Sequence, residues 1–338
     1  MDVELAITRY RLLFETAGDV RLPRFPGALW QGALGSALRR RVCTTGLPVC
    51  DGCPRLAECA YPLLFEAQRL FAGSAAPPPR PLVLEPGVDH GHLPPGRIIN
   101  LDIVLIGTAT RHAQAVLSAL SEAARVGLGR SRMRVMLVDI QHEGLNAGGW
   151  QSILDGAGHI ACHPIERVQI PPPPDGALLE FITPVRLRSR GQLVTPRSFT
   201  LSGLVHSIQG RVERLCLSYG SHDDAQSPGI GGRHVSLGPL SNGEHSDELA
   251  ATRQHLTWQV WQRCSTKTQT ETRLGGLMGI LELSGDTLAK VWPSLWLGQW
   301  IHVGTEANLG FGAYQIEALP EPAADCPPSL FRSGPVEA

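Results

Sequence analysis

The order of apolar segments along the chain constrains its fold most, because one pattern of strands and helices occurs twice. Runs of β-branched and apolar residues predict strands, and apolar residues at helical spacing predict the helices between them. The first half has predicted strands over 3–15, 81–85, 98–107 and 133–141 and predicted helices over 26–42 and 110–126. The second half has predicted strands over 179–188, 254–263, 274–284 and 312–317 and predicted helices over 198–217 and 287–297. Each half therefore has the order βαββαβ.

Two βαββαβ units predict an α+β fold with two tandem ferredoxin-like (RRM-like) domains, each an antiparallel sheet with two helices on one face. A run of four prolines at 171–174 marks a linker between them. The predicted boundaries are an N-terminal domain at 1–165, a linker at 166–178, a C-terminal domain at 179–320 and a tail at 321–338. Within the C-terminal domain, the polar segment 220–250 is typical of a long insertion.

The composition suits a globular protein, since 43% of the 338 residues are apolar and 18% are charged. No apolar run is long enough to cross a bilayer, and the acidic N-terminus is unlike a signal peptide. These features predict a cytoplasmic protein with no membrane partner. The net charge of −1 argues mildly against nucleic-acid binding.

Arginine is nevertheless unusually prominent, because only two of the 30 basic residues are lysines. Six arginines stand against one acid between Pro184 and Arg214. Guanidinium groups bind phosphate through paired hydrogen bonds and stack on bases, which suits RNA. In a strand, Arg186, Arg188 and Arg190 would share one face, and we expect them to follow an RNA backbone. A GC-rich genome is the alternative explanation for the arginines.

Four of the eight cysteines crowd into VCTTGLPVCDGCPRLAEC with the spacing C-x6-C-x2-C-x5-C. They are Cys43, Cys50, Cys53 and Cys59. A C-x2-C pair on a turn places two thiolates on one side of a metal, and two more complete a tetrahedral site. The pattern predicts a metal-binding insertion at 43–59 that holds structural zinc, because nothing in the sequence indicates redox chemistry. An iron–sulfur cluster and four free thiols are the alternatives.

Three glycines, Gly304, Gly310 and Gly312, lie in the segment HVGTEANLGFGAY, between apolar flanks that resemble strands. Glycine permits positive φ and a close approach of the backbone, so N–H groups of this segment could face phosphates. A tight hairpin without a ligand is the alternative. The segment is not a nucleotide P-loop, since no G-K-[ST] follows and the next element is a strand.

Several motifs in combination resemble the repeat-processing endoribonucleases of CRISPR systems, which belong to the RAMP superfamily of tandem ferredoxin-like folds. These motifs are ITPVRLRSRG, GGLMGILELSGD, WPSLWLGQWIHVG and HVGTEANLGFGAY. The stretch FPGALWQGALGSALRRRVC, followed by the cysteines and YPLLFE, is similar to one branch of that family. The resemblance covers most of the chain outside 220–250. It favours an RNA-contacting role for Gly304, Gly310 and Gly312.

The resemblance implies that the chain binds the repeat hairpin of CRISPR RNA and cleaves precursor RNA at its foot without a catalytic metal. In this family the ribose 2′-OH attacks the adjacent phosphate, which leaves a 2′,3′-cyclic phosphate and a 5′-OH. Such chemistry needs a base, an acid and a cation for the crowded phosphorane. Family members often carry a histidine on or near the first helix, whereas no histidine precedes His90 in this chain.

Three interpretations of the chemistry stay open. Arg24, Arg39 and Arg40 could orient the phosphate and stabilise its charge in a slow enzyme. A histidine from elsewhere could transfer protons, and His302 is the candidate because it adjoins the glycines. The site could also be inactive. The sequence does not rank the other histidines outside the insertion, which include His90, His92, His142, His159, His163 and His255.

The leading hypothesis is therefore an endoribonuclease that processes guide RNA, stays on its product and joins other subunits of a CRISPR effector complex. A non-catalytic RNA-binding subunit of such a complex is the alternative. A zinc-dependent enzyme is less favoured, because four thiolates would close the coordination shell and leave no position for a substrate.

Overall fold

The structure is a computed structural model, and it describes residues 2–71, 77–129, 131–144, 148–161, 163, 165, 167–220, 249–264 and 271–319. Most of the insertion expected at 220–250 and the whole tail expected at 321–338 lie outside these residues.

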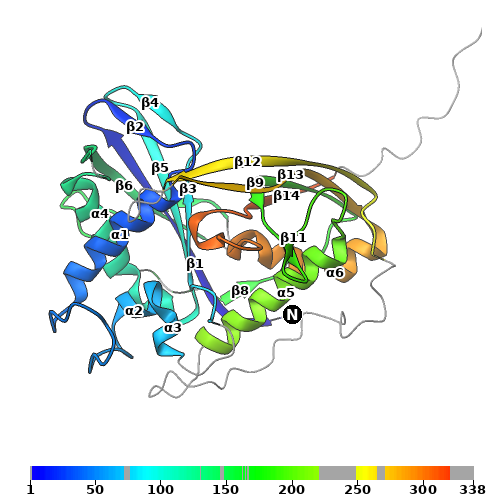
Figure 1. The fold of residues 1–338 in the computed structure, drawn as a ribbon, viewed down its shortest axis with the longest axis horizontal. Coiled ribbons are helices and arrows are strands. Elements are labelled where there is room, and N and C mark those ends of the chain that lie inside the picture. The colour runs from blue at the N-terminus through cyan, green and yellow to red at the C-terminus, as the bar shows by residue number, and fades with distance from the viewer. Residues whose placement is uncertain are drawn as a thin grey trace, which may run out of the picture.

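The N-terminal half is an antiparallel sheet with two long helices on one face (Figure 1). Its main elements are β1 (Asp2–Thr16), α1 (Gly27–Val42), β3 (Leu82–Pro86), β5 (Ile98–Ile106), α4 (Ala113–Val126) and β6 (Val135–Glu143). The strand order is β3-β5-β1-β6-β7, where β7 is Trp150–Ser152. This is the βαββαβ order that the sequence predicts for the first half, including the weak strand at 81–85.

Shorter elements surround this sheet. They are the strands β2 (Val20–Leu22), β4 (Gly91–Leu93) and β8 (Arg167–Gln169), the helices α2 (Ala60–Phe65) and α3 (Ala67–Leu70), and the 3-10 helix η1 (Gly107–His112). Strands β2 and β4 pair into a separate two-stranded ribbon, with Leu22 opposite Gly91. The segment expected as a linker contains β8, which pairs with the start of β1.

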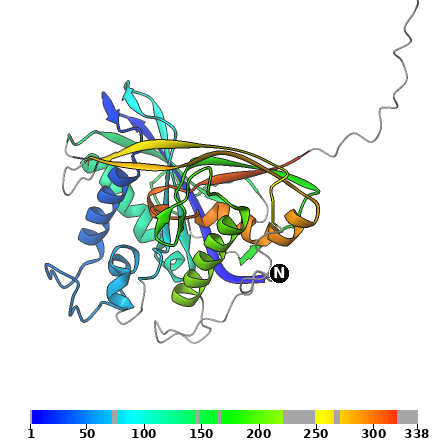
Figure 2. The ribbon, with the colours of Figure 1, turned by 45° about the vertical axis from the view of Figure 1, so that its right-hand side comes forward.

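The C-terminal half repeats the arrangement. Its elements are β9 (Gly176–Val185), α5 (Leu201–Tyr219), β12 (Arg253–Cys264), β13 (Glu271–Ser284), α6 (Gly285–Ile301) and β14 (Tyr314–Ala318), with a small hairpin of β10 (Arg188–Ser189) and β11 (Gln192–Leu193) and the 3-10 helix η2 (Ala307–Leu309). The sheet order β12-β13-β9-β14 corresponds strand for strand to β3-β5-β1-β6. In Figures 1 and 2 one end of the long β12–β13 hairpin lies over the N-terminal half.

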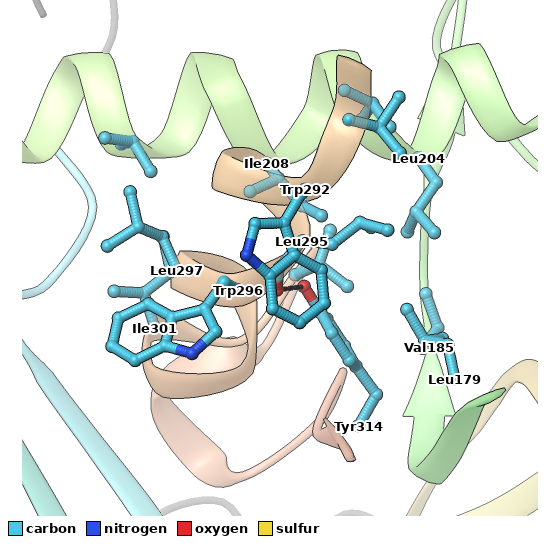
Figure 3. Packing of buried hydrophobic residues seen from close by; sticks show 14 of the residues in the cluster. Leu179, Val185, Leu204, Ile208, Trp292, Leu295, Trp296, Leu297, Ile301 and Tyr314 are labelled. Atoms are coloured by element: carbon cyan, nitrogen blue, oxygen red, sulfur yellow. Dashed lines mark hydrogen bonds between the residues drawn. The ribbon is translucent and has the colours of Figure 1, made fainter. Parts of the chain in front are cut away.

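Helix α6 forms the centre of the C-terminal core (Figure 3). Its residues Trp292, Leu295 and Ile301 are buried together with Ile208 of α5. The hydroxyl of Tyr314 donates a hydrogen bond of 2.6 Å to the carbonyl of Leu295, which ties β14 to this helix. Among the helices that the structure describes, none has the length and apolarity of a membrane span.

The two halves also share apolar packing. One face of the N-terminal sheet, with Leu12 and Ile103, packs under α1 and α4. On the opposite face, Ile7 and Val104 belong to the same buried cluster as residues of α5 and α6. This packing fixes where the first strands stand relative to the C-terminal half.

Two sequence-based expectations are wrong in ways that matter for the site. The strand predicted over 179–188 ends at Val185, and the chain then turns into the β10–β11 hairpin. The helix predicted over 287–297 extends to Ile301, so the glycines follow a helix and not a strand. The interpretation of residues 302–314 as a hairpin turn between two strands is therefore wrong.

Candidate active site

A cavity of about 470 Å³ lies where the two halves meet. Its walls come from β1, β3 and β5 on one side, and from β12, α6 and the glycine-containing segment on the other. The face of the N-terminal sheet changes character along its strands: Leu5 and Ile7 of β1 are in the shared core, whereas Arg9 and Arg11, next on the same face, line the cavity. The cavity is thus the polar end of a mostly apolar interface.

A dense ion-pair network covers this end of the sheet. Arg9 contacts Glu85 at 2.6 Å, Glu143 at 3.2 Å and Asp102 at 3.3 Å, and Arg11 contacts Asp102 at 2.6 Å. Burial by itself raises the pKa of Glu85, but Arg9 and His302 outweigh this effect and lower that pKa to about 2. Because carboxylates already neutralise Arg9 and Arg11, these arginines position the walls of the cavity and are poor partners for a phosphate.

His302 is buried in the wall of the same cavity. Its Nε2 atom lies 2.7 Å from Oε1 of Glu85, and its Nδ1 atom lies 3.0 Å from the carbonyl oxygen of Phe311. Only 1% of the residue is exposed. Both ring nitrogens face oxygen acceptors, so neither can accept a proton from a substrate. The geometry assigns His302 to the support of the glycine-containing segment, in place of the proton transfer predicted from the sequence.

The three glycines pack the segment against the protein. Gly304, Gly310 and Gly312 have φ values of 84°, 94° and 72°. A Cβ on Gly310 would lie 2.6 Å from the carbonyl oxygen of Leu84, and one on Gly304 or Gly312 would overlap the carbonyl oxygens of Arg186 or Val303. The N–H of Gly310 donates to Ala307 and that of Gly312 donates to Pro184. These close contacts with other backbone atoms of the protein explain why the three positions are glycine. A phosphate would have to approach the segment from the side that faces away from these contacts.

Arg24 is the predicted catalytic residue that the structure brings to the glycine-containing segment. It is exposed between β2 and α1, and its guanidinium lies 5.8 Å from the ring centre of Trp261. The start of α1 touches the segment, since a Cβ on Gly27 would overlap the carbonyl oxygen of Leu309. Within the described residues Arg24 has no ion pair, which leaves its charge available to a phosphate in the cavity.

Arg39 and Arg40 lie at the opposite end of α1. Twelve residues of helix separate Gly27 from Arg39, a rise of about 18 Å. Arg39 donates hydrogen bonds to the carbonyls of Leu47 and Pro48, and Arg40 lies 3.8 Å from Glu122. The prediction that Arg24, Arg39 and Arg40 act together on one phosphate is wrong for this reason.

The three arginines after β9 do not share a strand face. Arg186 is buried, and its guanidinium donates to the carbonyl of Gly275. Arg188 and Arg190 are exposed in and beside the β10–β11 hairpin, where Arg190 has a φ of 49°. The predicted continuous track is wrong, because the strand ends before Arg186. Arg188 and Arg190 stay available to a ligand.

The four cysteines of the segment 43–59 line one cavity of about 180 Å³ at the end of α1. The hydroxyl of Thr45 lies 3.8 Å from Sγ of Cys43 and 3.6 Å from Sγ of Cys53. Burial raises the pKa of the Cys59 thiol, and the nearby Cys43 and Cys53 raise it further. The donors suit zinc, although within the described residues no three His, Cys, Asp or Glu side chains already have the arrangement of metal ligands.

Sequence reasoning missed most of the cavity wall, above all Arg9, Arg11, Glu85, Asp102 and Trp261. A usable signal exists for the charged ones, since they interrupt otherwise apolar strands at alternate positions. His90 also lines the cavity, and nothing in its local sequence distinguishes it from the other histidines.

Comparison with known families gives two matches. Residues 5–165 match a family model described as an N-terminal domain. Residues 179–314 match the model of the CRISPR-associated endoribonuclease Cas6. A search of curated proteins gives no match.

Similar solved structures include several Cas6 proteins. A Cas6 product complex has a TM-score of 0.49 and 15% identity, covering 91% of this chain and 98% of that one. Cas6 from Thermus thermophilus has a TM-score of 0.47 and 12% identity, covering 93% of this chain and 99% of that one. The partial Cas6-RT-Cas1–Cas2 complex has a TM-score of 0.51 and 10% identity, covering 95% of this chain but 47% of that one. The last likeness indicates a shared fold.

Proposed function

We propose that the chain is a Cas6-type CRISPR-associated endoribonuclease, because its residues 179–314 match that family model, and that it binds CRISPR repeat RNA and cleaves the precursor in the cavity between its two halves. The observation that carries the proposal is the position of Arg24, an exposed cation that lines this cavity together with Gly310 and has no ion pair among the described residues. We also propose that each βαββαβ half is a ferredoxin-like domain, which the matching strand orders of the two sheets support.

The proposed reaction is attack of a ribose 2′-oxygen on the neighbouring phosphorus. The new O2′–P bond forms as the P–O5′ bond breaks, so the products are a 2′,3′-cyclic phosphate and a 5′-OH. Extra negative charge develops on the phosphorane oxygens, and a guanidinium fixed nearby stabilises that charge more than it stabilises the substrate. Arg24 can supply this stabilisation, because it has no ion pair with any residue that the structure describes and Trp261 limits its movement.

The test is cleavage of a repeat RNA taken from the CRISPR array of the same genome, without added metal and with EDTA present during the reaction. We expect a 5′-OH product and a cyclic phosphate, and no cleavage of a matched RNA that carries 2′-deoxyribose at the cut position. Binding without cleavage would favour the non-catalytic subunit. Activity that disappears with EDTA would favour the zinc-dependent enzyme.

Arg188 and Arg190 are proposed to hold the RNA outside the cavity. A second hollow, lined by Arg24, Trp258 and Arg273, offers an aromatic surface for stacking. Replacing Arg188 and Arg190 together by alanine should weaken repeat binding and reduce the slope of log Kd against log salt by about 1–2. Arg214→Ala, which removes an exposed charge from α5, is the matched control. Equal effects of the two changes would reassign the hairpin arginines to a solvated surface.

We propose that Cys43, Cys50, Cys53 and Cys59 hold one structural zinc ion. Four thiolates around one small cavity repel each other, and a divalent cation would remove that repulsion while closing the segment. Elemental analysis of reduced protein should find about one zinc per chain, lost in Cys53→Ser and retained in Cys216→Ser. A folded, reduced protein without metal would contradict the proposal.

We further propose that the protein keeps its cleaved product and joins other CRISPR subunits. The presence of a Cas6 part in a complex with Cas1 and Cas2 supports assembly of this kind for a related chain. Gel filtration after cleavage should recover RNA with the protein, and rapid release of product would contradict retention.

A further inference from the structure

The cavity has a charge-stabilising group in Arg24 but needs a group that moves protons. In the described structure, the β2–β4 ribbon brings a histidine to the same place. Leu22 of β2 is paired with Gly91 of β4, and antiparallel pairing therefore sets position 23 opposite His90. Arg24 is the next residue, and both side chains line the cavity. The ribbon thus places His90 beside the start of α1, although 66 positions separate it from Arg24 in the numbering.

The loop that carries His90 is fixed before any ligand binds. The N–H of Gly87 donates 2.9 Å to the carbonyl of Asn100, at the start of the loop. Asp89 accepts two hydrogen bonds from Arg97, at 3.1 and 2.8 Å. A catalytic side chain must be held in this way, because a misplaced proton acceptor loses most of its effect.

Within the described residues, one ring nitrogen of His90 has a hydrogen-bond partner and the other has none. Its Nδ1 atom lies 3.0 Å from the carbonyl oxygen of Val88, and since a carbonyl only accepts, Nδ1 carries the proton. In that tautomer Nε2 holds a lone pair. His90 is also exposed, so substrate can reach this nitrogen.

We propose that His90 is the general base of the cleavage reaction and acts with Arg24; this assignment rests on the function proposed above. Nε2 of His90 takes the proton of the attacking 2′-OH as the O2′–P bond forms. The P–O5′ bond breaks, and the leaving 5′-oxygen takes a proton from water. The imidazolium then returns its proton to solvent, so the enzyme is regenerated and no further reactant is consumed.

Other histidines of the described structure are less suited. Both nitrogens of His302 face acceptors inside the wall. Nε2 of His142 is used by Thr8, and Nε2 of His163 is used by Tyr10. His92 is exposed on the same ribbon, but it lies 3.4 Å from Asp19 and does not line the cavity. His92 is therefore the matched control for an exposed ribbon histidine.

The experiment compares single-turnover cleavage of the repeat RNA by wild type, His90→Ala and His92→Ala, with Kd and melting temperature measured for each. We expect His90→Ala to lose about 100-fold or more of the cleavage rate while its Kd and melting temperature stay near wild type. His92→Ala should cleave at the wild-type rate. Added imidazole should restore part of the rate to His90→Ala only, because it replaces the missing proton acceptor.

Three results would overturn the assignment. Cleavage by His90→Ala at the wild-type rate would exclude His90 from proton transfer and leave the endoribonuclease function intact. A loss of rate that is matched by an equal loss of RNA affinity would make His90 a binding residue. A wild-type protein that binds the repeat without cleaving it would instead overturn the proposed function, and the assignment with it.

Discussion

Helix α1 is held in different ways at its two ends. At its start, Gly27 packs under the carbonyl of Leu309, and Phe25 lies in a buried cluster with Phe311 and Leu274 of the other half. At its end, exposed hydrogen bonds run from Arg39 to the cysteine segment, and the Arg40 side chain of the nearby ion pair is 54% exposed. Close packing across the two halves fixes the start, whereas the arginines at the end make only exposed polar contacts.

The two ends of α1 therefore suit different roles: the start can hold a group that acts on a phosphate, and the end carries the cysteine segment. A group that acts on a phosphate must be fixed to a fraction of an ångström, and the start of α1 meets that requirement through Arg24 and its neighbours. The end of α1 lacks such packing and carries the four cysteines, where a metal would supply the missing constraint. We expect substitutions at the start to cost far more stability than equivalent ones at the end.

The sharpest test removes one carboxylate from the cavity wall near the start of α1 and one carboxylate beside the end of α1. Glu85→Ala should destabilise the protein by about 3–5 kcal/mol, because it removes the carboxylate that pairs with Arg9 and with Nε2 of buried His302. Glu122→Ala, which removes the exposed partner of Arg40, should cost about 0–1 kcal/mol. Urea unfolding at pH 7 measures both. Comparable losses would remove the distinction between the two ends.

Acid should weaken the start of α1 selectively. The pKa of Glu85 falls from 4.5 to about 2 in the folded protein, so its contribution is complete above pH 4.5 and is lost as the pH falls towards 2. The full loss is about 3 kcal/mol by linkage. Unfolding followed across this range should show a steep decline in wild type and a shallower one in Glu85→Gln. Parallel curves for the two proteins would contradict the assignment of this decline to Glu85.

The last comparison concerns two glycines at positive φ. Gly310 has a φ of 94° and a carbonyl oxygen 2.6 Å from the position of a Cβ, whereas Gly46 in the cysteine segment has a φ of 66° and open space. Alanine at Gly46 should cost only the backbone strain, about 1–2 kcal/mol, and alanine at Gly310 should cost more. Thermal unfolding of both variants measures the difference. If the two costs are equal, close packing at Gly310 is unimportant.

Local patterns predicted the elements of the fold well. The helix predicted over 26–42 rests on apolar residues at helical spacing, and three of them, Trp30, Leu34 and Leu38, are buried in one cluster of α1. Alternation and β-branched residues identified the long strands. Prediction failed where the end of an element depends on contacts with residues far away in the sequence. Strand β9 ends before Arg186, and the Arg186 side chain donates a hydrogen bond to the carbonyl of Gly275 on another strand.

The candidate site could be predicted only in part for the same reason. The glycines carry a local signature and a family resemblance, and Arg24 directly precedes the stretch FPGALWQGALGSALRRRVC. The pairing of His302 with Glu85 joins residues 217 positions apart, and the approach of His90 to Arg24 depends on the register of a short ribbon. Such contacts cannot be predicted from spacing along the chain. The sequence therefore favours His302, which adjoins the glycines, over His90, which only the fold brings to the cavity.

Strand β8 has a consequence for any attempt to divide the molecule. It lies in the stretch that prolines mark as a linker, yet it pairs with the first residues of β1. A fragment that ended at residue 165 would lack this strand and leave the start of β1 as a bare edge, open to pairing with another chain. It would also expose Ile7 and Val104, whose packing partners lie in the other half. We expect such fragments to aggregate. We also expect that, after proteolytic cleavage between the halves, the two fragments stay associated until the whole protein unfolds.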